Sequence, residues 1–198
     1  AENISIEQHQ KFKIATLANP WTKGKTLHTY ILVDRKDSAT CGPLPDGTVI
    51  YTPLRRAVMF VSAHIALAGM LGASGNIAGV ADTRFIRLAN IIRKVKSGEI
   101  TDCGESMNPN VERIIETCPD ALFLSPFENS GGYGSLEKTG IPIIECAEYM
   151  ETSALGRAEW MRFYGMLLGK EHEADSLFAL TESKYNELKN MAKQSKTR

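Results

Sequence analysis

Nine polar, charged or aromatic residues lie in short segments that follow apolar runs, and together they could hold a ligand. They are Ser62, His64, Arg84, Glu105, Ser106, Phe127, Glu128, Tyr133 and Glu148. Arginine pairs with anionic groups, aromatic rings stack on flat or cationic groups, and oxygens complete the hydrogen bonds. This set suits a large, flat or anionic small molecule, and we expect Arg84, Phe127 and Tyr133 to be its main contacts.

Four of these residues also have a structural role open to them. Ser62 could cap the helix that follows it, and His64 would lie in the first turn of that helix, where a histidine is more often structural than a ligand. Arg84 could pair with a nearby carboxylate. Tyr133 could be an ordinary surface residue of a glycine-rich loop.

Known catalytic and metal-binding patterns match poorly. The run Gly132–Glu137 lacks the third glycine of a dinucleotide-binding loop, and Gly104–Asn108 lacks the closing glycine of a nucleophile elbow. No HExxH occurs, and the scattered histidines leave only His64 well placed for a metal ion. We therefore expect no catalytic residue, no metal site and no cofactor, and we expect that the protein is not an enzyme.

The composition limits the class of protein. The chain has 198 residues, 43% of them hydrophobic, which is enough for one sizeable domain. A formal net charge of +0 argues against a nucleic-acid partner bound through a basic surface. No apolar run approaches the ~20 residues of a membrane span. The opening residues AENI are not a signal peptide, so the protein is either cytosolic or an exported form that has been trimmed.

The four cysteines leave the redox compartment open. Cys41, Cys103, Cys118 and Cys146 form no CxxC pair and match no zinc spacing. Cys118 and Cys146 lie in apolar runs and are expected to be buried. A disulfide is possible in an exported chain, but its pairing is not determined by the sequence.

The middle of the chain alternates apolar strands with helices. Strands are expected at 57–61, 77–80, 121–125 and 141–146, with helices at 65–71 and 85–96 among them. This alternation predicts an α/β fold, in which a parallel sheet carries helices on both faces. Ligands bind at the carboxyl ends of such strands. That rule selects the segments 62–64, 81–84, 103–107, 126–134 and 147–153, which also contain Asp82, Asn129, Tyr149 and Glu151.

The two ends of the chain differ from this middle part. An antiparallel, hairpin-like layer is expected from three strands, at 12–17, 29–33 and 48–51. The strand at 12–17 is expected to be an edge strand. Helices are expected at 155–168, ended by Gly169, and at 171–193, which would be roughly 30 Å long. We therefore divide the chain into an N-terminal extension (1–56), an α/β ligand-binding lobe (57–169) and a long linking helix (170–198).

The segment 104–126 is predicted to form a loop, a helix, a break and a buried strand. Asn108 can cap the helix, with Pro109 in the first turn, and Pro119 ends it. Glu112 lies in the first turn, where a carboxylate favours the helix dipole by about 0.5 kcal/mol. One apolar face follows from helical spacing, and its members are Val111, Ile114, Ile115 and Cys118.

In order and spacing, these segments resemble the N-terminal lobe of periplasmic substrate-binding proteins of ABC importers. The subgroup is the one that binds ferric siderophores, haem and cobalamin. The similar segments, within about Tyr30 to the end, are Val58–Gly72, Ile77–Val80, Gly104–Ile114 with its Asn-x-Glu-x-Ile pattern, Pro119–Asp120 and Leu136–Pro142. The run Glu148–Trp160 resembles a subgroup of Bacteroidetes lipoproteins.

The resemblance implies a two-lobed protein with a ligand cleft between the lobes, joined by the helix 171–193; the second lobe is not in this sequence. It implies capture of an iron–siderophore, haem or cobalamin ligand outside the inner membrane and its delivery to an ABC transporter permease. It also implies an exported location, either periplasmic or as a membrane-anchored lipoprotein. Glu112 matches the glutamate that docks against arginines of the permease, a role compatible with its place in the helix.

Two other classes of function stay open. One is an α/β enzyme that binds a nucleotide or tetrapyrrole in the same strand-end crevice. The other is a one-lobe interaction module.

Overall fold

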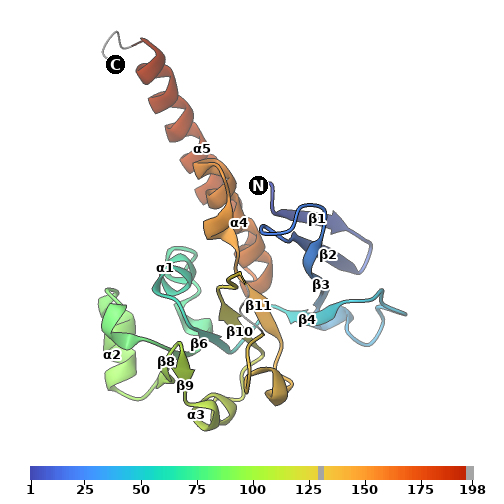
Figure 1. Ribbon diagram of the computed structural model, residues 1–198, viewed down its shortest axis with the longest axis vertical. Coiled ribbons are helices and arrows are strands. Elements are labelled where there is room, and N and C mark those ends of the chain that lie inside the picture. Colours follow the sequence, from blue (N-terminus) through green and yellow to red (C-terminus); the bar gives the residue numbers. More distant parts are fainter. Residues whose placement is uncertain (129–131, 195–198) are drawn as a thin grey trace.

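The computed structural model describes residues 1–128 and 132–194. A four-stranded sheet lies beside a five-stranded sheet, and helices pack around the larger one (Figure 1). The strands are β1 (Ile4–Gln8), β2 (Phe12–Ala18), β3 (Thr26–Asp34), β4 (Thr48–Thr52), β5 (Ala57–Met59), β6 (Ile77–Val80), β7 (Thr101–Asp102), β8 (Gly104–Glu105), β9 (Asn108–Pro109), β10 (Ala121–Leu124) and β11 (Ile143–Glu145). The helices are α1 (Ser62–Met70), α2 (Ala89–Lys96), α3 (Val111–Glu116), α4 (Ala154–Leu168) and α5 (Glu171–Gln194).

The five-stranded sheet has the order β11-β10-β5-β6-β7, and all its neighbouring strands are parallel. Its strands are continuous apolar runs because both faces of the sheet are covered. Met59 and Phe123 face a large core shared with α1, α2 and α4. The alternate residues Val58 and Leu122 face a smaller core with Ile114 of α3. The predicted α/β fold with helices on both faces is confirmed.

At Gly79, β6 lies so close to its neighbouring strands that no residue larger than glycine would fit. A Cβ atom at Gly79 would lie 2.7 Å from Sγ of Cys103 and 3.1 Å from Cγ2 of Val58. The glycine in the Ile-Ala-Gly-Val strand is therefore a packing requirement, because the sulfur of the neighbouring strand's end fills the space of a side chain.

The four-stranded sheet has the order β1-β2-β3-β4. β1, β2 and β3 are antiparallel neighbours, whereas β3 and β4 are parallel. The prediction of a wholly antiparallel layer was wrong because residues 35–47 form a crossover of the length that a parallel pair needs, about a dozen residues. β2 is also not an edge strand, since β1 pairs with it on its outer side. β1 is short and largely exposed, and its only apolar residues are Ile4 and Ile6.

The hydroxyl of Tyr30 joins the two sheets. It donates to the carbonyl oxygen of Ile143 at 2.9 Å and accepts from the amide of Glu145 at 2.8 Å, so it pairs two backbone groups of the edge strand β11. Tyr30 is fully buried, and burial raises the pKa of its hydroxyl well above the ordinary value, so the proton stays in place. Residues from both sheets therefore pack into one core.

The helix predicted at 85–96 begins later, at Ala89. Thr83–Phe85 is a 3₁₀ turn, η3, that follows Asp82 in a left-handed conformation, with φ of 49°. This turn places Phe85 on the surface, 53% exposed, while Ile86 and Ile91 enter the core. Apolar spacing alone missed this because the chain must first turn out of β6 before a helix can start.

α3 is shorter than predicted, and a different residue caps it. The side chain of Asn110 accepts from the amide of Arg113 at 3.0 Å, while Asn108 and Pro109 form β9 and pair with β8. The helix ends at Glu116, before the predicted apolar face is complete. Cys118 is therefore exposed, contrary to the prediction, whereas Cys146 is buried as expected.

All four cysteines are free.

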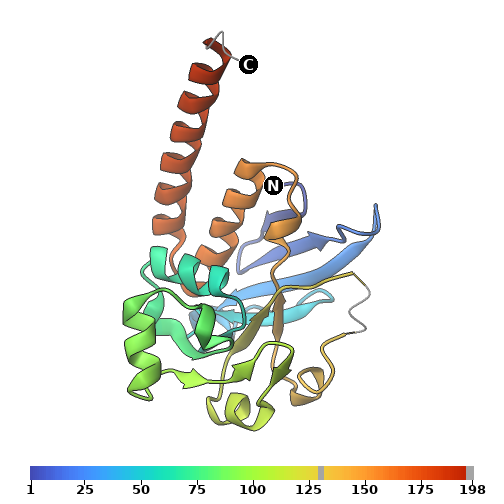
Figure 2. The same cartoon turned by 60° about the vertical axis from the view of Figure 1, so that its left-hand side comes forward.

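α4 and α5 follow the prediction closely. Gly169, with φ of 67°, ends α4, and α5 starts two residues later. From Glu182 onward every described residue of α5 is exposed, and this half of the helix projects away from the two sheets (Figures 1 and 2). Among the described residues, no helix combines the length and apolar character needed to cross a membrane.

Replacing Tyr30 with phenylalanine tests the joint between the sheets. Tyr30→Phe leaves the carbonyl of Ile143 and the amide of Glu145 without their partner, so the free energy of unfolding should fall by about 2–3 kcal/mol in urea denaturation. The control is Tyr185→Phe on the projecting half of α5, where the side chain is 37% exposed and the substitution should change stability little. Equal losses in the two variants would contradict the proposed joint.

Candidate functional site

The loops that follow the five parallel strands lie at one edge of the sheet and are called the strand-end surface here. Its described parts are residues 62–64, 81–85, 103–107, 125–128 and 146–153. Parallel strands direct their carboxyl ends to the same edge, so segments far apart in the sequence meet there. Two groups of side chains occupy this edge, one exposed and one buried.

The exposed group consists of the exposed Arg84 and Glu105 with the partly buried Asp82 and Ser106, at the ends of β6 and β7. Ser106 Oγ donates to Asp82 Oδ2 at 2.5 Å, and the backbone amide of Asp82 donates to the carbonyl of Gly104 at 2.8 Å. The guanidinium of Arg84 lies 4.0 Å from Asp82 and 3.8 Å from Glu105. These long pairs on a side chain that is 65% exposed are weak, so the guanidinium can still bind an anionic ligand.

The buried group lies at the ends of β5, β10 and β11 and is called the buried histidine cluster. It consists of His64, Ser125, Cys146, Glu148 and Tyr164. His64 Nε2 lies 3.3 Å from Glu148 Oε1 and 3.4 Å from Ser125 Oγ, both longer than a good hydrogen bond. His64 is 1% exposed, so its ring is out of contact with solvent. The two long contacts are weaker than the hydrogen bonds that the ring would make with water.

Burial controls protonation inside this cluster. It raises the pKa of the Cys146 thiol well above its ordinary value, and the nearby Glu148 charge adds to this effect. Burial also raises the pKa of the Tyr164 hydroxyl. Both groups are therefore neutral in the cluster as it stands.

Tyr133 points to a different network, between the two sheets. Its hydroxyl donates to Glu145 Oε1 at 2.9 Å, and burial followed by the charge of Glu145 raises the pKa of that hydroxyl. His28 contacts the other oxygen of Glu145 at 3.0 Å and Thr48 Oγ1 at 2.8 Å. These residues line a hollow of about 600 Å³. Tyr133 is thus a partner of Glu145 at this hollow.

Exposed rings surround the two groups of the strand-end surface. Phe85 is 53% exposed, Phe127 51% and Tyr149 39%. The guanidinium of Arg84 lies over the ring of Phe85, 4.8 Å from its centroid. Tyr149 lies in the 3₁₀ turn η5 (Glu148–Met150), and its hydroxyl donates to the carbonyl of Pro126, which ties the loops after β10 and β11 together.

Ser62 and Glu128 lie at the same edge without joining either group, and Glu112 lies on α3, outside the strand-end loops. Ser62 is exposed and does not cap α1, since Val61 occupies the N-cap position without a side-chain hydrogen bond. Glu128 is exposed, and Asn129 lies outside the described residues. Glu112 is exposed in the first turn of α3.

Sequence reasoning missed Ser125 and Cys146 as site residues. Each was assigned to the end of a predicted strand, yet the structure ends β10 at Leu124 and β11 at Glu145, so both begin strand-end loops. The signal was present, because a polar or thiol residue directly follows each apolar run. His28 and Glu145 gave no such signal, since their pairing joins strands of two different sheets.

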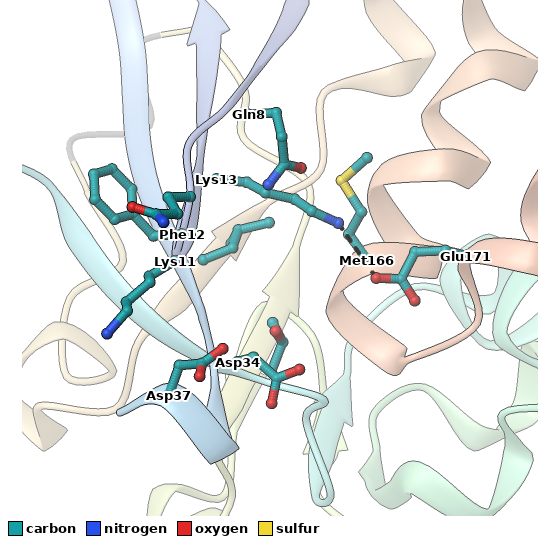
Figure 3. Close-up of a pocket in the computed structure, with 11 residues that line it drawn as sticks. Gln8, Lys11, Phe12, Lys13, Asp34, Asp37, Met166 and Glu171 are labelled. Carbon is teal, nitrogen blue, oxygen red and sulfur yellow. Dashed lines mark hydrogen bonds and ion pairs between the residues drawn. The ribbon is translucent and has the colours of Figure 1, made fainter. Parts of the chain in front are cut away.

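A separate cavity lies near the start of α5, away from the strand-end surface. It has a volume of about 180 Å³ and lies between β2, β3 and the α4–α5 junction (Figure 3). Lys13 pairs with Glu171 across it at 3.4 Å. Small-molecule sites commonly measure about 300–1,000 Å³. This cavity is smaller than that range, and Lys13 and Glu171 on its wall already pair with each other, so it is a poor candidate for a ligand site.

Glu151 belongs to a strand-end loop but has a structural role. Its carboxylate accepts from the amides of Glu2 and Asn3, at 2.9 and 3.0 Å, and from the indole of Trp160 at 2.8 Å. Burial would raise the pKa of Glu151, but these hydrogen bonds outweigh it and hold the pKa below the ordinary value. The carboxylate therefore fixes the N-terminal residues against α4.

Residues 61–198 match the family model described as "Periplasmic binding protein". The chain belongs to the periplasmic binding protein family. The matched region begins where β5 leads into α1, so it includes every loop of the strand-end surface.

Relatives and solved structures agree with this family. An uncharacterized lipoprotein of Methanocaldococcus jannaschii is 31% identical over 141 residues, which cover 68% of this chain and 34% of the relative. The siderophore-binding protein BauB, solved with two molecules of acinetobactin and ferric iron, has a TM-score of 0.60 at 19% identity. It covers 75% of this chain, which covers 52% of BauB.

The petrobactin-binding protein YclQ of Bacillus subtilis has a TM-score of 0.57 at 19% identity. The match covers 73% of this chain and 49% of YclQ. At this identity the two solved structures show a shared fold. The chain spans about a third of the curated relative's length and about half of each solved structure.

Replacing Glu151 with glutamine tests its structural role. Glu151→Gln sets an amide group against N–H donors, so the free energy of unfolding should fall by about 1–3 kcal/mol at neutral pH. The folded-state pKa lies below the ordinary value of 4.5, so the wild type keeps this stability above that pH and loses it as the pH falls further. Urea denaturation across pH 3–7 should show the two proteins converging in acid.

The matched control for this substitution is Glu182→Gln, on the exposed half of α5. It should change stability little at any pH. A constant difference between Glu151→Gln and the wild type down to low pH would contradict the role of the carboxylate charge.

Proposed function

We propose that the chain is the N-terminal lobe and linking helix of the substrate-binding component of an ABC importer. The observation that carries this proposal is the strand-end surface, which presents Arg84 beside the exposed ring of Phe85 and carries two further exposed rings, Phe127 and Tyr149, in the loops after β10 and β11. Large apolar side chains exposed together are typical of binding surfaces, and this edge is where open parallel sheets bind ligands. Membership of the periplasmic binding protein family supports the same role.

The ligand we propose is an iron–siderophore, haem or cobalamin-type molecule. The guanidinium of Arg84 can bind an anionic group of such a ligand, and the rings can pack on its flat parts. The siderophore ligands of similarly folded binding proteins support this class. An exported location, periplasmic or as a membrane-anchored lipoprotein, is supported by the lipoprotein relative.

α5 is proposed to be the linking helix between two lobes. Tyr185, Leu188 and Met191 are exposed on its projecting half, at a spacing of three residues, and so form a stripe along one side. A second lobe that packs near this stripe would cover it. The chain's match to about half of each solved structure supports the same arrangement.

Glu112 is proposed to dock the protein on its permease. It is exposed in the first turn of α3, so its carboxylate is free to pair with a cation on a partner. Charges at the rim of a transient interface chiefly steer association. This function is compatible with the favourable interaction between Glu112 and the helix dipole.

Calorimetric titration of the full-length protein with a ferric siderophore, haem and cobalamin tests ligand capture. One of these should bind saturably, and Arg84→Ala and Phe127→Ala should each weaken it about tenfold, or roughly 1.4 kcal/mol. Arg93→Ala, an exposed arginine on α2, is the control and should leave affinity unchanged. Absence of binding by all three ligands, or an effect of Arg93→Ala equal to that of Arg84→Ala, would refute the proposal.

An uptake assay in cells tests docking. Glu112→Ala in the full-length protein should leave ligand affinity unchanged and reduce uptake about fivefold, which corresponds to roughly 1 kcal/mol of interface energy. Glu116→Ala, exposed in the last turn of the same helix, is the matched control and should transport normally. Normal uptake by Glu112→Ala would remove the docking role.

A further inference from the structure

The buried histidine cluster contains polar atoms that the described chain does not satisfy. His64 Nδ1, Glu148 Oε2 and Tyr164 Oη are buried and, among residues 1–128 and 132–194, have no hydrogen-bond partner. Buried polar groups in native proteins almost always have a partner, from the protein, a water or an ion. His64 Nε2, on the other side of the ring from Nδ1, makes only long contacts, 3.3 Å to Glu148 Oε1 and 3.4 Å to Ser125 Oγ. Neither ring nitrogen of this buried histidine therefore has a good partner, which indicates a species bound beside Nε2.

The donor atoms of this cluster are arranged for a metal ion. His64, Cys146 and Glu148 each bring one ligand atom to within 4.8 Å of the other two. The separation of 3.3 Å between His64 Nε2 and Glu148 Oε1 is close to the ligand–ligand distance on a tetrahedral ion with bonds of about 2.0–2.1 Å. The side chain of Glu148, on η5, is 16% exposed, so it has room to adjust its position around an ion.

We propose that His64, Cys146 and Glu148 bind a divalent transition-metal ion of the zinc class. Nitrogen, thiolate sulfur and carboxylate oxygen form a ligand set typical of that ion, with a fourth position left for Ser125 Oγ or a water molecule. Binding releases the thiol proton to solvent, because the thiolate is the ligand. The two negative ligands then cancel the charge of the dication, which allows it to be buried.

Other histidines and cysteines of the chain show what is distinctive here. Both ring nitrogens of His28 have partners at ordinary distances, 3.0 and 2.8 Å. Cys103 is equally buried, and its thiol donates to the carbonyl of Thr101 at 3.7 Å much as that of Cys146 does to Ile144 at 3.5 Å, but Cys103 belongs to no group of three metal-ligating side chains among the described residues. Only in the buried histidine cluster, within the described residues, do a histidine, a cysteine and a carboxylate meet.

The ion would fix part of the strand-end surface. Glu148 begins η5, the turn that also carries the exposed ring of Tyr149. His64 and Cys146 belong to the buried body of the fold, so a shared ion ties this turn to α1 and to the end of β11. The metal site does not depend on the identity of the transported ligand, and it needs no permease.

Titration with Co²⁺, a spectroscopic substitute for zinc, tests the site. The full chain is unfolded and refolded in the presence of Co²⁺, so that the ion can reach the buried site. The parent chain carries Cys41→Ser and Cys118→Ser, which remove the two less buried thiols. One Co²⁺ per chain should bind, with thiolate-to-metal charge-transfer absorption and the visible bands of a tetrahedral ion. Cys146→Ser should lose the charge-transfer band, and His64→Gln and Glu148→Gln should weaken Co²⁺ about a hundredfold.

Cys103→Ser is the matched control, because it alters an equally buried thiol outside the cluster, and it should bind Co²⁺ normally. Circular dichroism of each variant reports folding, and Glu148→Gln keeps the test valid if a core variant does not fold, since Glu148 is partly exposed. Absence of stoichiometric Co²⁺ in the folded parent chain would overturn the proposal, leaving water as the bound species. Retention of the charge-transfer band by Cys146→Ser would also overturn it.

Discussion

The hydroxyl of Tyr30 is the contact on which the rest of the arrangement depends. β11 is the edge strand of the parallel sheet, and Tyr30 pairs its otherwise open backbone groups at Ile143 and Glu145. The N-terminal sheet thereby covers that edge and shares one core with the parallel sheet. An open edge would invite pairing with other chains, so this contact protects the edge as well as placing the strand-end loops.

Some polar groups of the strand-end surface have good hydrogen-bond partners and others do not. The well-paired groups stabilise the fold, whereas the poorly paired ones are those we propose for binding. Glu151 has hydrogen-bond partners for both carboxylate oxygens, and it holds the N-terminal residues against α4. Arg84 has only long ion pairs, and buried atoms of His64 and Glu148 have no partner in the described chain. Groups left incompletely paired at the carboxyl edge of a parallel sheet are where a ligand gains most from binding.

The local signals that were interpreted correctly were continuous apolar runs and helix stops. Runs at 57–61 and 121–125 formed buried parallel strands, and Gly169 ended α4 as its position predicted. The errors arose where tertiary contacts override spacing. Asp82 adopts a left-handed conformation that delays α2, and the β8–β9 pair takes Asn108 away from the cap of α3.

The sequence by itself determined the α/β class and the long C-terminal helix, because apolar periodicity is a local property. It also indicated the edge of the sheet proposed to carry the site, because strands that alternate with helices are parallel and ligands bind at their carboxyl ends. Only the tertiary structure decided which side chains meet. His64, Cys146 and Glu148 come together because the sheet order places β5, β10 and β11 side by side. Strand order depends on long-range packing of the whole core, and no local pattern in the sequence encodes it.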